Sequence, residues 1–200
     1  MNSRVFLVIF MCLSSSIGIS KHIECDLTRD DFKPLITNAQ ILHRTKEVAT
    51  QINSDYAGQQ IVLIMVMKGA VCFASELMQQ ITVPCTIEYI QASSYGQNGI
   101  QAGALTLKGI ENIDLEGKHI LLVDDIFDTG VTITKIKVEL SKHNPASIKS
   151  AVLLVKNKAR TMQEVPEYIA FTIENQFVIG YGLDYKELYR GLPDILVKKD

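Results

Sequence analysis

A chain of 200 residues, 47% of them hydrophobic, is long enough for one α/β domain with a small appendage and apolar enough to form a core. Its formal net charge of −2, with both signs interspersed along the chain, provides no basic surface for a nucleic-acid backbone. We therefore expect no nucleic-acid partner.

The cysteines favour neither a zinc site nor a disulfide framework. Cys12, Cys25, Cys72 and Cys85 form no CxxC pair, and none has a histidine at zinc-ligand spacing. Because Cys72 and Cys85 fall within apolar stretches, we expect free core thiols, as in a protein of a reducing compartment.

The amino-terminal segment differs from the rest of the chain. Arg4 precedes the apolar run Val5–Leu13, and small residues follow as far as position 20. This pattern is typical of a secretory signal peptide, and the run is too short to span a bilayer comfortably. An extra amino-terminal helix and an overlong start assignment are the alternatives. We therefore separate a signal-like or extra leader, residues 1–30, from a domain of residues 31–200.

The first predicted helix begins at Asn38, a candidate N-cap, and closes at Tyr56-Ala57-Gly58. Six of its residues fall at helical spacing: Ile41, Leu42, Thr45, Val48, Ala49 and Ile52. The pattern predicts a helix that covers one face of a sheet, with His43 and Arg44 solvated.

A strand, a short turn and a second helix come next. The continuous apolar run Ile61–Met67 predicts a central parallel strand, and a helix is predicted from Val71 to Gln80. Lys68-Gly69-Ala70 lies between them. An isolated Lys-Gly pair is a common surface turn, but between a strand end and a helix start it indicates an anion site.

A hairpin is predicted after this helix. Val83–Ser93 alternates in part and predicts a strand, and Leu105–Lys108 predicts its returning partner. The polar segment between them, from Ser94 to Gly103, contains three glycines and predicts a loop.

The most informative stretch follows the apolar run His119–Val123, which predicts a buried strand. Asp124, Asp125 and Asp128 then lie at its carboxyl end, where open α/β sheets bind their ligands. The turn Thr129-Gly130-Val131-Thr132 supplies backbone N–H groups and hydroxyls for a phosphate at the start of a helix. Carboxylates only accept hydrogen bonds, so we expect the acids to face sugar hydroxyls.

The segment after this turn has an ambiguous period. Ile133, Ile136 and Leu140 suit a helix, whereas Ile136, Val138 and Leu140 equally fit a strand. The need for a helix amino terminus at the phosphate, with Asn144-Pro145 as a stop, favours the helix.

The rest of the chain predicts three further strands: Ile148–Val155, Tyr168–Ile173 and Phe177–Gly180. Taken alone, Lys156 is a solvated strand-end lysine, Phe177 a core residue and Arg190 a surface residue on a last helical turn.

A family resemblance changes those default interpretations. The segment Asp124–Thr132 follows an apolar run and consists of two acids, two apolar residues and Asp-Thr-Gly-x-Thr. It resembles the 5-phosphoribosyl pyrophosphate (PRPP) signature of type I phosphoribosyltransferases. Ser94-Tyr95-Gly96 matches the start of a lid loop in the hypoxanthine-guanine branch, and Phe177–Arg190 matches that branch's carboxyl-terminal purine segment. The resemblance covers roughly Leu35–Val197.

The resemblance implies a fold and a reaction. The fold is α/β, the type I phosphoribosyltransferase fold: a central, mostly parallel twisted sheet flanked by helices, with a small hood subdomain from the chain ends. The reaction is purine salvage, the transfer of the 5-phosphoribosyl group from PRPP to N9 of hypoxanthine or guanine, giving IMP or GMP and pyrophosphate. Mg²⁺ is the implied cofactor. A homodimer or homotetramer is implied, with no stable membrane association and a cytoplasmic location, since PRPP and free purines are cytosolic.

The same resemblance assigns binding residues. PRPP and nucleotide contacts fall to Asp124, Asp125, Thr129, Gly130, Val131 and Thr132. Pyrophosphate contacts fall to Lys68, Gly69 and Arg190, with a cis bond between Lys68 and Gly69. Purine contacts fall to Lys156, Phe177, Val178 and Asp184.

Catalysis, metal binding and closure are assigned in the same way. Asp128 is the implied general base near N7 of the purine. Asp184 is the implied magnesium ligand, with Asp124 and Asp125 as further candidates. Ser94 and Tyr95 belong to the implied lid, which keeps water from the ribosyl cation.

Three features depart from the family pattern. Asp124 stands where purine-salvage members often carry Glu, Phe127 is bulkier than the usual aliphatic residue, and the leader is foreign to the family. The first two are expected to affect affinity for PRPP and not the class of reaction.

Two rival functions use the same motif. A PRPP-sensing module of a transcriptional regulator is disfavoured because the implied catalytic side chains are present and no helix-turn-helix precedes the domain. A nucleotide hydrolase is suggested by the Walker B-like run Leu121–Asp125, but the chain has no GxxxxGK[ST] loop. An adenine-specific or xanthine-accepting transferase remains an alternative within the enzyme class.

Overall fold

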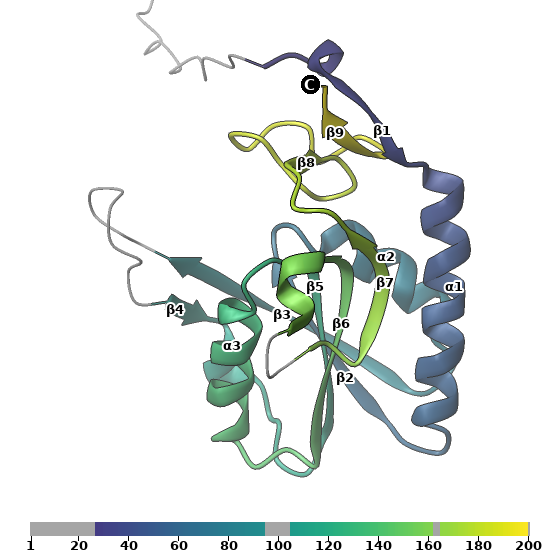
Figure 1. The fold of residues 1–200 in the computed structure, drawn as a ribbon. Coiled ribbons are helices and arrows are strands. Elements are labelled where there is room, and N and C mark those ends of the chain that lie inside the picture. Colours follow the sequence, from purple (N-terminus) through teal and green to yellow (C-terminus); the bar gives the residue numbers. More distant parts are fainter. Residues whose placement is uncertain (1–26, 95–104, 162–164, 200) are drawn as a thin grey trace, which may run out of the picture.

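The computed structural model describes residues 27–94, 105–161 and 165–199, which form two sheets. The larger sheet has six strands in the order β4-β3-β2-β5-β6-β7 (Figure 1). Five of its strands are parallel: β2 (Ile61–Met67), β3 (Cys85–Ser94), β5 (His119–Phe127), β6 (Ser147–Lys156) and β7 (Tyr168–Ile173). The edge strand β4 (Leu105–Lys108) is antiparallel to β3. Continuous apolar runs form the central strands because both faces of a parallel sheet are covered.

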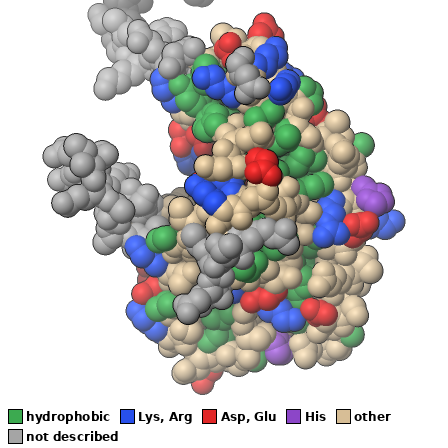
Figure 2. All heavy atoms as spheres, in the orientation of Figure 1, with side chains coloured by type: hydrophobic (Ala, Val, Ile, Leu, Met, Phe, Trp, Pro, Cys, Tyr) green, Lys and Arg blue, Asp and Glu red, His purple; other side chains and the backbone are tan. Residues whose placement is uncertain are grey.

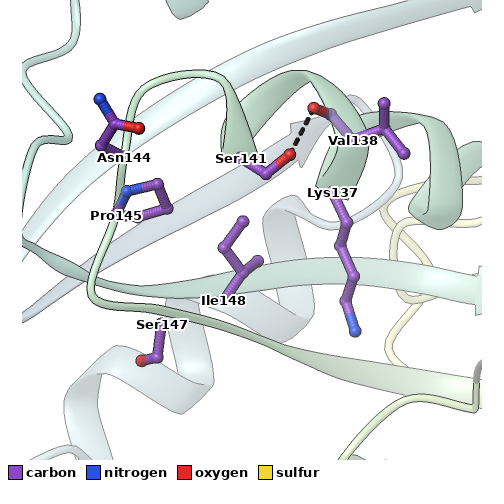
Figure 3. Close-up of a pocket in the computed structure, with 7 residues that line it drawn as sticks. All are labelled: Lys137, Val138, Ser141, Asn144, Pro145, Ser147 and Ile148. Carbon is purple, nitrogen blue, oxygen red and sulfur yellow. Dashed lines mark hydrogen bonds between the residues drawn. The ribbon is translucent and has the colours of Figure 1, made fainter.

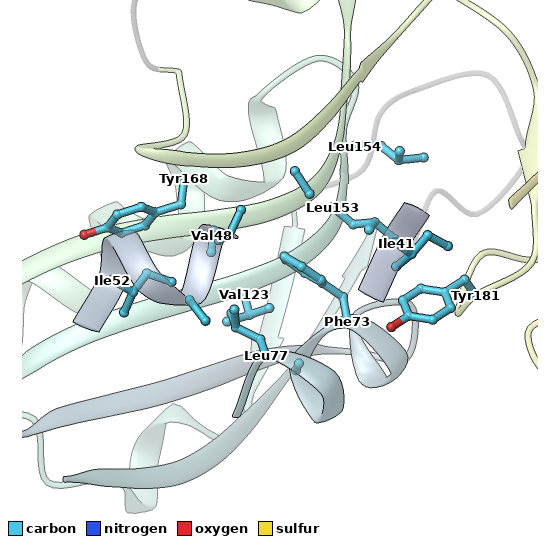
Figure 4. Close-up of a cluster of buried hydrophobic side chains, with 14 of the residues drawn as sticks. Ile41, Val48, Ile52, Phe73, Leu77, Val123, Leu153, Leu154, Tyr168 and Tyr181 are labelled. Atoms are coloured by element: carbon cyan, nitrogen blue, oxygen red, sulfur yellow. The ribbon is translucent and has the colours of Figure 1, made fainter. Parts of the chain in front are cut away.

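Helices cover both faces of this sheet. α1 (Asn38–Asp55) and α2 (Val71–Gln80) pack on one face, and α3 (Val131–Ser141) packs on the other. Figure 4 shows side chains of the core between α1, α2 and the sheet, to which the segment after β8 adds Tyr181: Ile41, Val48, Ile52, Phe73, Leu77, Val123, Leu153, Leu154, Tyr168 and Tyr181. The hydrophobic cores on the two faces of the sheet hold the strands rigidly, so the loops begin and end at fixed positions.

A separate three-stranded sheet, which we call the hood, lies above the carboxyl ends of the large sheet's strands (Figure 1). It consists of β1 (Phe32–Ile36), β9 (Ile195–Lys198) and β8 (Val178–Ile179), all antiparallel. Its own small core contains Phe32, Ile179 and Leu196. The hood thus joins the beginning and the end of the described chain, as the fold class predicted.

Short 3₁₀ helices complete the described residues: η1 (Arg29–Asp31), η2 (Ile110–Asn112) and η3 (Asn157–Thr161). No helix in the described ranges is both long and apolar enough to cross a membrane.

Several predicted bounds are confirmed exactly, namely those of β2, α2, β4 and β7. The strand predicted to end at Val123 was too short, since β5 continues to Phe127 and includes both acids. The strands predicted at 83–93 and 148–155 lie at 85–94 and 147–156. The last predicted strand was too long, because only Val178–Ile179 pairs with β9.

The start of α1 also differs from the prediction. Thr37, not Asn38, is the N-cap: its side chain accepts a hydrogen bond from the backbone N–H of Gln40, and the Gln40 side chain accepts one from the backbone N–H of Thr37. This reciprocal capping box satisfies two amide groups at the helix start. Arg44 is not simply solvated either, since its guanidinium donates to the carbonyl oxygens of Ile169 and Ala170 on β7, whereas His43 is exposed.

The two cysteines within the described residues agree with the prediction of free thiols. Cys72 and Cys85 are free, half-buried and packed against the α1–α2 core. Burial raises the pKa of both thiols above the usual value.

Candidate active site

The candidate site begins at the topological switch point of the large sheet. β2 and β5 are neighbours, but the chain leaves β2 toward β3 on one side and leaves β5 toward β6 on the other. Open α/β sheets bind ligands at the carboxyl ends of two such strands. Lys68-Gly69 follows β2, while Asp124 and Asp125 lie in the last part of β5. The predicted anion turn and the predicted acids therefore meet.

Two glycines close this junction tightly. A Cβ on Gly69 would overlap the Asp125 carboxylate, and a Cβ on Gly182 would overlap the carbonyl oxygen of Gly69. The segment that follows β8 thus packs directly on the turn after β2, and that turn packs on β5. The cis peptide bond of this turn joins Met67 and Lys68, so the prediction of a cis Lys68–Gly69 bond was wrong by one residue.

The first of the paired acids of β5 is buried, and the second is half-buried. Asp124 is only 5% exposed, and its Oδ1 accepts a hydrogen bond from the backbone N–H of Asp125 at 2.9 Å. Burial, reinforced by the neighbouring Asp125 charge, holds the pKa of Asp124 well above its usual range. Burial also raises the pKa of Asp125, against the opposing effects of hydrogen bonds and Arg190. Such a pair favours a ligand that supplies hydrogen-bond donors or positive charge.

This burial has a consequence for stability. Because folding raises the pKa of Asp124, the folded protein holds that proton more tightly, and stability falls as pH rises from the unfolded pKa toward the folded one. At pH 7 we expect Asp124→Asn to raise the free energy of unfolding. Each kcal/mol gained should raise the melting temperature by about 2–4 °C. Scanning calorimetry should show the gain shrinking toward pH 4.

Asp114→Asn provides the control for that measurement. Its carboxylate is exposed, and a hydrogen bond from Lys118 lowers its pKa, so its removal should not stabilise the protein at pH 7. A melting temperature of Asp124→Asn below that of the wild type at pH 7 would show that ionised Asp124 does not oppose folding.

The turn after β5 leads into α3 as predicted. Gly130 is the residue before the helix and has a φ of 71°, a conformation that glycine adopts without strain. Thr129 is exposed, Gly130 is buried, Val131 is 50% exposed and Thr132 is half-buried. A helix amino terminus that opens to the surface beside carboxylates is suited to a phosphate group.

Asp128 lies between two lysines, Lys156 at the end of β6 and Lys158 in η3. Its Oδ2 is 3.1 Å from Nζ of Lys156, and its Oδ1 is 2.8 Å from Nζ of Lys158. Burial alone would raise the pKa of Asp128, but hydrogen bonds from Lys158 and Lys156 outweigh burial and lower it. Asp128 is therefore an ionised carboxylate at neutral pH, next to a lysine predicted to contact the purine.

The carboxyl-terminal segment places charged groups around the Gly182 junction. The Arg190 guanidinium contacts Asp184 Oδ1 at 2.7 Å and donates to the carbonyl oxygen of Gly182 at 2.7 Å. Lys68, from the turn after β2, pairs with Glu187 at 2.6 Å. The two predicted pyrophosphate cations thus meet in the same small region. The interpretation of Arg190 as part of a helical turn was wrong, because this segment is built of turns.

Phe177 is not a core residue, since 46% of it is exposed. Its ring meets the ring of Tyr185 edge-on, with 5.7 Å between centroids, and lies 6.4 Å from the ring of Phe32. Val178, the next residue, is buried in β8. An aromatic face supported at its edge and open to solvent is suited to stacking on a planar base.

The predicted lid is the part of the site that lies at the limit of the described residues. Ser94 ends β3, and Tyr95 lies outside the described ranges. Three contributors were given no role from the sequence: Lys158, Gly182 and Glu187. The two lysines at 156 and 158 gave a weak local signal in the sequence that Lys158 belongs to the site. The Lys68–Glu187 pair joins residues 119 positions apart, so no local sequence pattern indicates it.

The donor groups allow a magnesium ion only together with a substrate. Within the described ranges, no three His, Cys, Asp or Glu side chains are grouped so as to hold a metal by themselves. Mg²⁺ is usually held through one or two carboxylates plus substrate phosphates. The adjacent acids of β5 and the half-buried Asp184 meet that description.

The described residues also form a hollow away from this site. It lies beside the carboxyl end of α3, where β6 begins (Figure 3). The hydroxyl of Ser141 in it donates to the carbonyl oxygen of Val138, and Lys137 pairs with Glu167. Figure 2 shows acidic and basic side chains intermixed on the face in view, with no large patch of one sign.

The fold and the switch-point site together define a protein of the type I phosphoribosyltransferase class. Residues 35–186 match the model of the phosphoribosyl transferase domain. The chain belongs to the phosphoribosyl transferase family.

The relatives have a common name. The hypoxanthine-guanine phosphoribosyltransferase of Streptococcus pneumoniae strain R6 is 37% identical over 174 residues, which cover 87% of this chain and 97% of the relative. That of Mycobacterium bovis is 37% identical over 185 residues, with coverages of 89% and 92%. A hypoxanthine-guanine phosphoribosyltransferase structure from Bacillus anthracis, with HEPES in its active site, has a TM-score of 0.78 at 36% identity and coverages of 84% and 98%.

Proposed function

We propose that this protein is a purine salvage enzyme that transfers the 5-phosphoribosyl group from PRPP to N9 of hypoxanthine or guanine, giving IMP or GMP and pyrophosphate. The observation that carries this proposal is the junction of Gly69, Asp125 and Gly182, which joins the anion turn, the acids of β5 and the carboxyl-terminal segment in one place. The names of the relatives support the choice of purine.

The charges that develop in the reaction explain the groups around the sugar. Breaking the bond from the anomeric carbon to oxygen builds positive charge on the ribose and negative charge on the pyrophosphate. Lys68 and Arg190 stabilise the leaving pyrophosphate, and the backbone of Gly69 lines its path. Asp124 and Asp125 accept hydrogen bonds from the ribose hydroxyls and offset the positive charge. The 5′-phosphate binds at the start of α3, where its contacts are Thr129, Gly130, Val131 and Thr132.

The purine lies between the hood and the end of β6. Phe177 stacks on the base, and the backbone of Val178 meets its edge. Lys156 donates to the exocyclic oxygen of a 6-oxopurine and so disfavours adenine, whose 6-amino group is itself a donor. Asp128, held 3.1 Å from Lys156, accepts the purine proton near N7 as N9 becomes the nucleophile.

Mg²⁺ is the proposed cofactor; Asp184 would hold it, with Asp124 and Asp125 as further candidate ligands. When bound it would neutralise negative charge on the pyrophosphate. Asp184 already has a defined orientation, because its two oxygens contact Arg190 and the backbone N–H of Glu187.

The remaining proposals concern the protein as a whole. We propose a homodimer or homotetramer in the cytoplasm, with Ser94 and Tyr95 in a closing lid. We also propose that residues 31–200 form the domain and that residues 1–30 are a separate leader. Light scattering would measure the assembly, and the intact mass of the natural protein would show whether the leader is removed.

A substrate panel tests the function. The protein is incubated with PRPP and Mg²⁺ and, separately, with hypoxanthine, guanine, xanthine or adenine, and pyrophosphate and nucleotide are quantified. We expect IMP and GMP to form with one pyrophosphate each. Turnover of adenine or xanthine alone would replace the proposed substrate class, and PRPP binding without any turnover would favour a sensor.

A further inference from the structure

The two cations proposed for pyrophosphate converge on one carboxylate that the mechanism does not use. Oε2 of Glu187 is 2.6 Å from Nζ of Lys68, and Oε1 is 3.5 Å from a terminal nitrogen of Arg190. Each oxygen of Glu187 therefore faces one cation. A carboxylate and a phosphate oxygen present the same acceptor chemistry to lysine and arginine.

The backbone holds this carboxylate in place. Tyr185 and Leu188 exchange backbone hydrogen bonds of 3.1 and 2.9 Å, and the two residues between them, Lys186 and Glu187, have φ values of 50° and 67°. Positive φ at both central positions defines a type I′ turn, which normally selects glycine or asparagine. The N–H of Glu187 also donates to Asp184 at 2.8 Å. Strained positions of this kind cluster at functional sites.

We propose that Glu187 is an internal anion that occupies the pyrophosphate cations of the empty enzyme and is displaced when PRPP or pyrophosphate binds. The inference rests on the proposed function and adds a residue that sets pyrophosphate affinity. Displacement is feasible because the Lys68 and Glu187 side chains are 61% and 56% exposed, and exposed ion pairs are weak. The return of Glu187 to the cations then favours release of product pyrophosphate.

Contacts other than the one with Glu187 hold Arg190 in place. Within the described residues, Nε of Arg190 is buried and has no hydrogen-bond partner, while its terminal nitrogens contact Gly182, Asp184 and Glu187. Arg190 thus stays anchored by Gly182 and Asp184 when Glu187 moves away. When Glu187 occupies the cations in part of the molecules, the apparent affinity for the anion is the intrinsic affinity multiplied by the fraction of molecules in which the cations are open.

Glu187→Gln tests the inference, since it removes the charge and keeps the size of the side chain. We expect the inhibition constant of pyrophosphate and the KM for PRPP to fall by about threefold to tenfold. The difference from the wild type should shrink at high salt, where exposed charges are screened. Glu187→Ala should act in the same direction, which separates the loss of charge from any new contact of the amide.

Glu139→Gln is the matched control. Glu139 on α3 pairs with Lys142 at the same 2.6 Å, with comparable exposure, so it makes the same change in net charge outside the site. Its pyrophosphate inhibition constant should equal that of the wild type. Unchanged or weaker pyrophosphate binding in both Glu187 variants would overturn the inference, whereas a wild type that neither turns over PRPP nor binds pyrophosphate would overturn the proposed function itself.

Discussion

Asp128→Asn is expected to lower kcat by about 10²- to 10⁴-fold while the protein binds PRPP nearly as well as the wild type. The amide keeps the shape of the carboxylate but cannot accept the proton that the purine loses as N9 attacks. The effect should appear in kcat more than in the KM for PRPP, because the proposed ribose and phosphate contacts lie elsewhere on β5 and at the start of α3. Steady-state kinetics with hypoxanthine, together with titration calorimetry of PRPP, measure both quantities.

The ionisation of Asp128 sets the expected pH dependence. Its pKa is lowered because the hydrogen bonds from Lys158 and Lys156 outweigh burial, so it becomes protonated only below its usual range. The stabilising effect of these contacts is present above the unfolded pKa and is lost as pH falls through the lowered folded pKa. Asp128 should therefore cause no loss of kcat/KM between about pH 5 and 8. If the kcat/KM of the wild type changes with pH in that range, the titration of another group must be the cause.

Asp55→Asn is the control for the base assignment. Asp55 and Asp128 are equally exposed at 39%, and each has a lysine Nζ near 3 Å, but Asp55 pairs with Lys149 and Tyr168 at the opposite end of the sheet. Its removal should leave kcat unchanged. Equal losses of PRPP affinity and of kcat in Asp128→Asn would make Asp128 a ligand of PRPP and not the base.

The strands of the large sheet were predictable because strands that are buried on both faces consist largely of consecutive apolar residues. The run Ile61–Met67 is apolar throughout, and its bounds were exact. β5 was underestimated for the opposite reason. Its last residues pair with β6, for example Asp124 with Val152 and Phe127 with Val155, but the two acids interrupt the hydrophobic pattern. Polar residues held in a strand for function are invisible to a rule based on hydrophobicity.

The hood and the charged junction were less predictable because they depend on contacts between distant residues. β8 has only two residues and exists because it pairs with β9, which also pairs with β1 from the other end of the chain. Near Arg190, positive φ at Lys186, Glu187 and Tyr189 replaces the expected helical turn. No local composition rule predicts such a backbone, because none of these residue types prefers it. The roles of single residues there came from the family resemblance, and their geometry came from the structure.

Gly182→Ala is expected to destabilise the protein by about 2–5 kcal/mol and to raise the KM for PRPP. The residue has a φ of +102°, unfavourable for alanine by about 1–2 kcal/mol, and the new Cβ would overlap the carbonyl oxygen of Gly69, an overpacking that typically costs about 1–3 kcal/mol. Gly69 has no room to retreat, because it already abuts Asp125. The strain must therefore separate the carboxyl-terminal segment from the turn that carries Lys68.

Gly117→Ala separates the two causes in this prediction. Gly117 has a φ of +66° but nothing within 4 Å of its Cβ position, so alanine there meets only the backbone penalty. We expect its melting temperature to fall by about 2–8 °C, since one kcal/mol corresponds to about 2–4 °C in a chain of this size, and its KM for PRPP to stay unchanged. For Gly182→Ala the fall should be about 4–20 °C. If the two variants lost equal stability and kept the same KM, the packing of Gly182 on Gly69 would not be what holds the pyrophosphate site together.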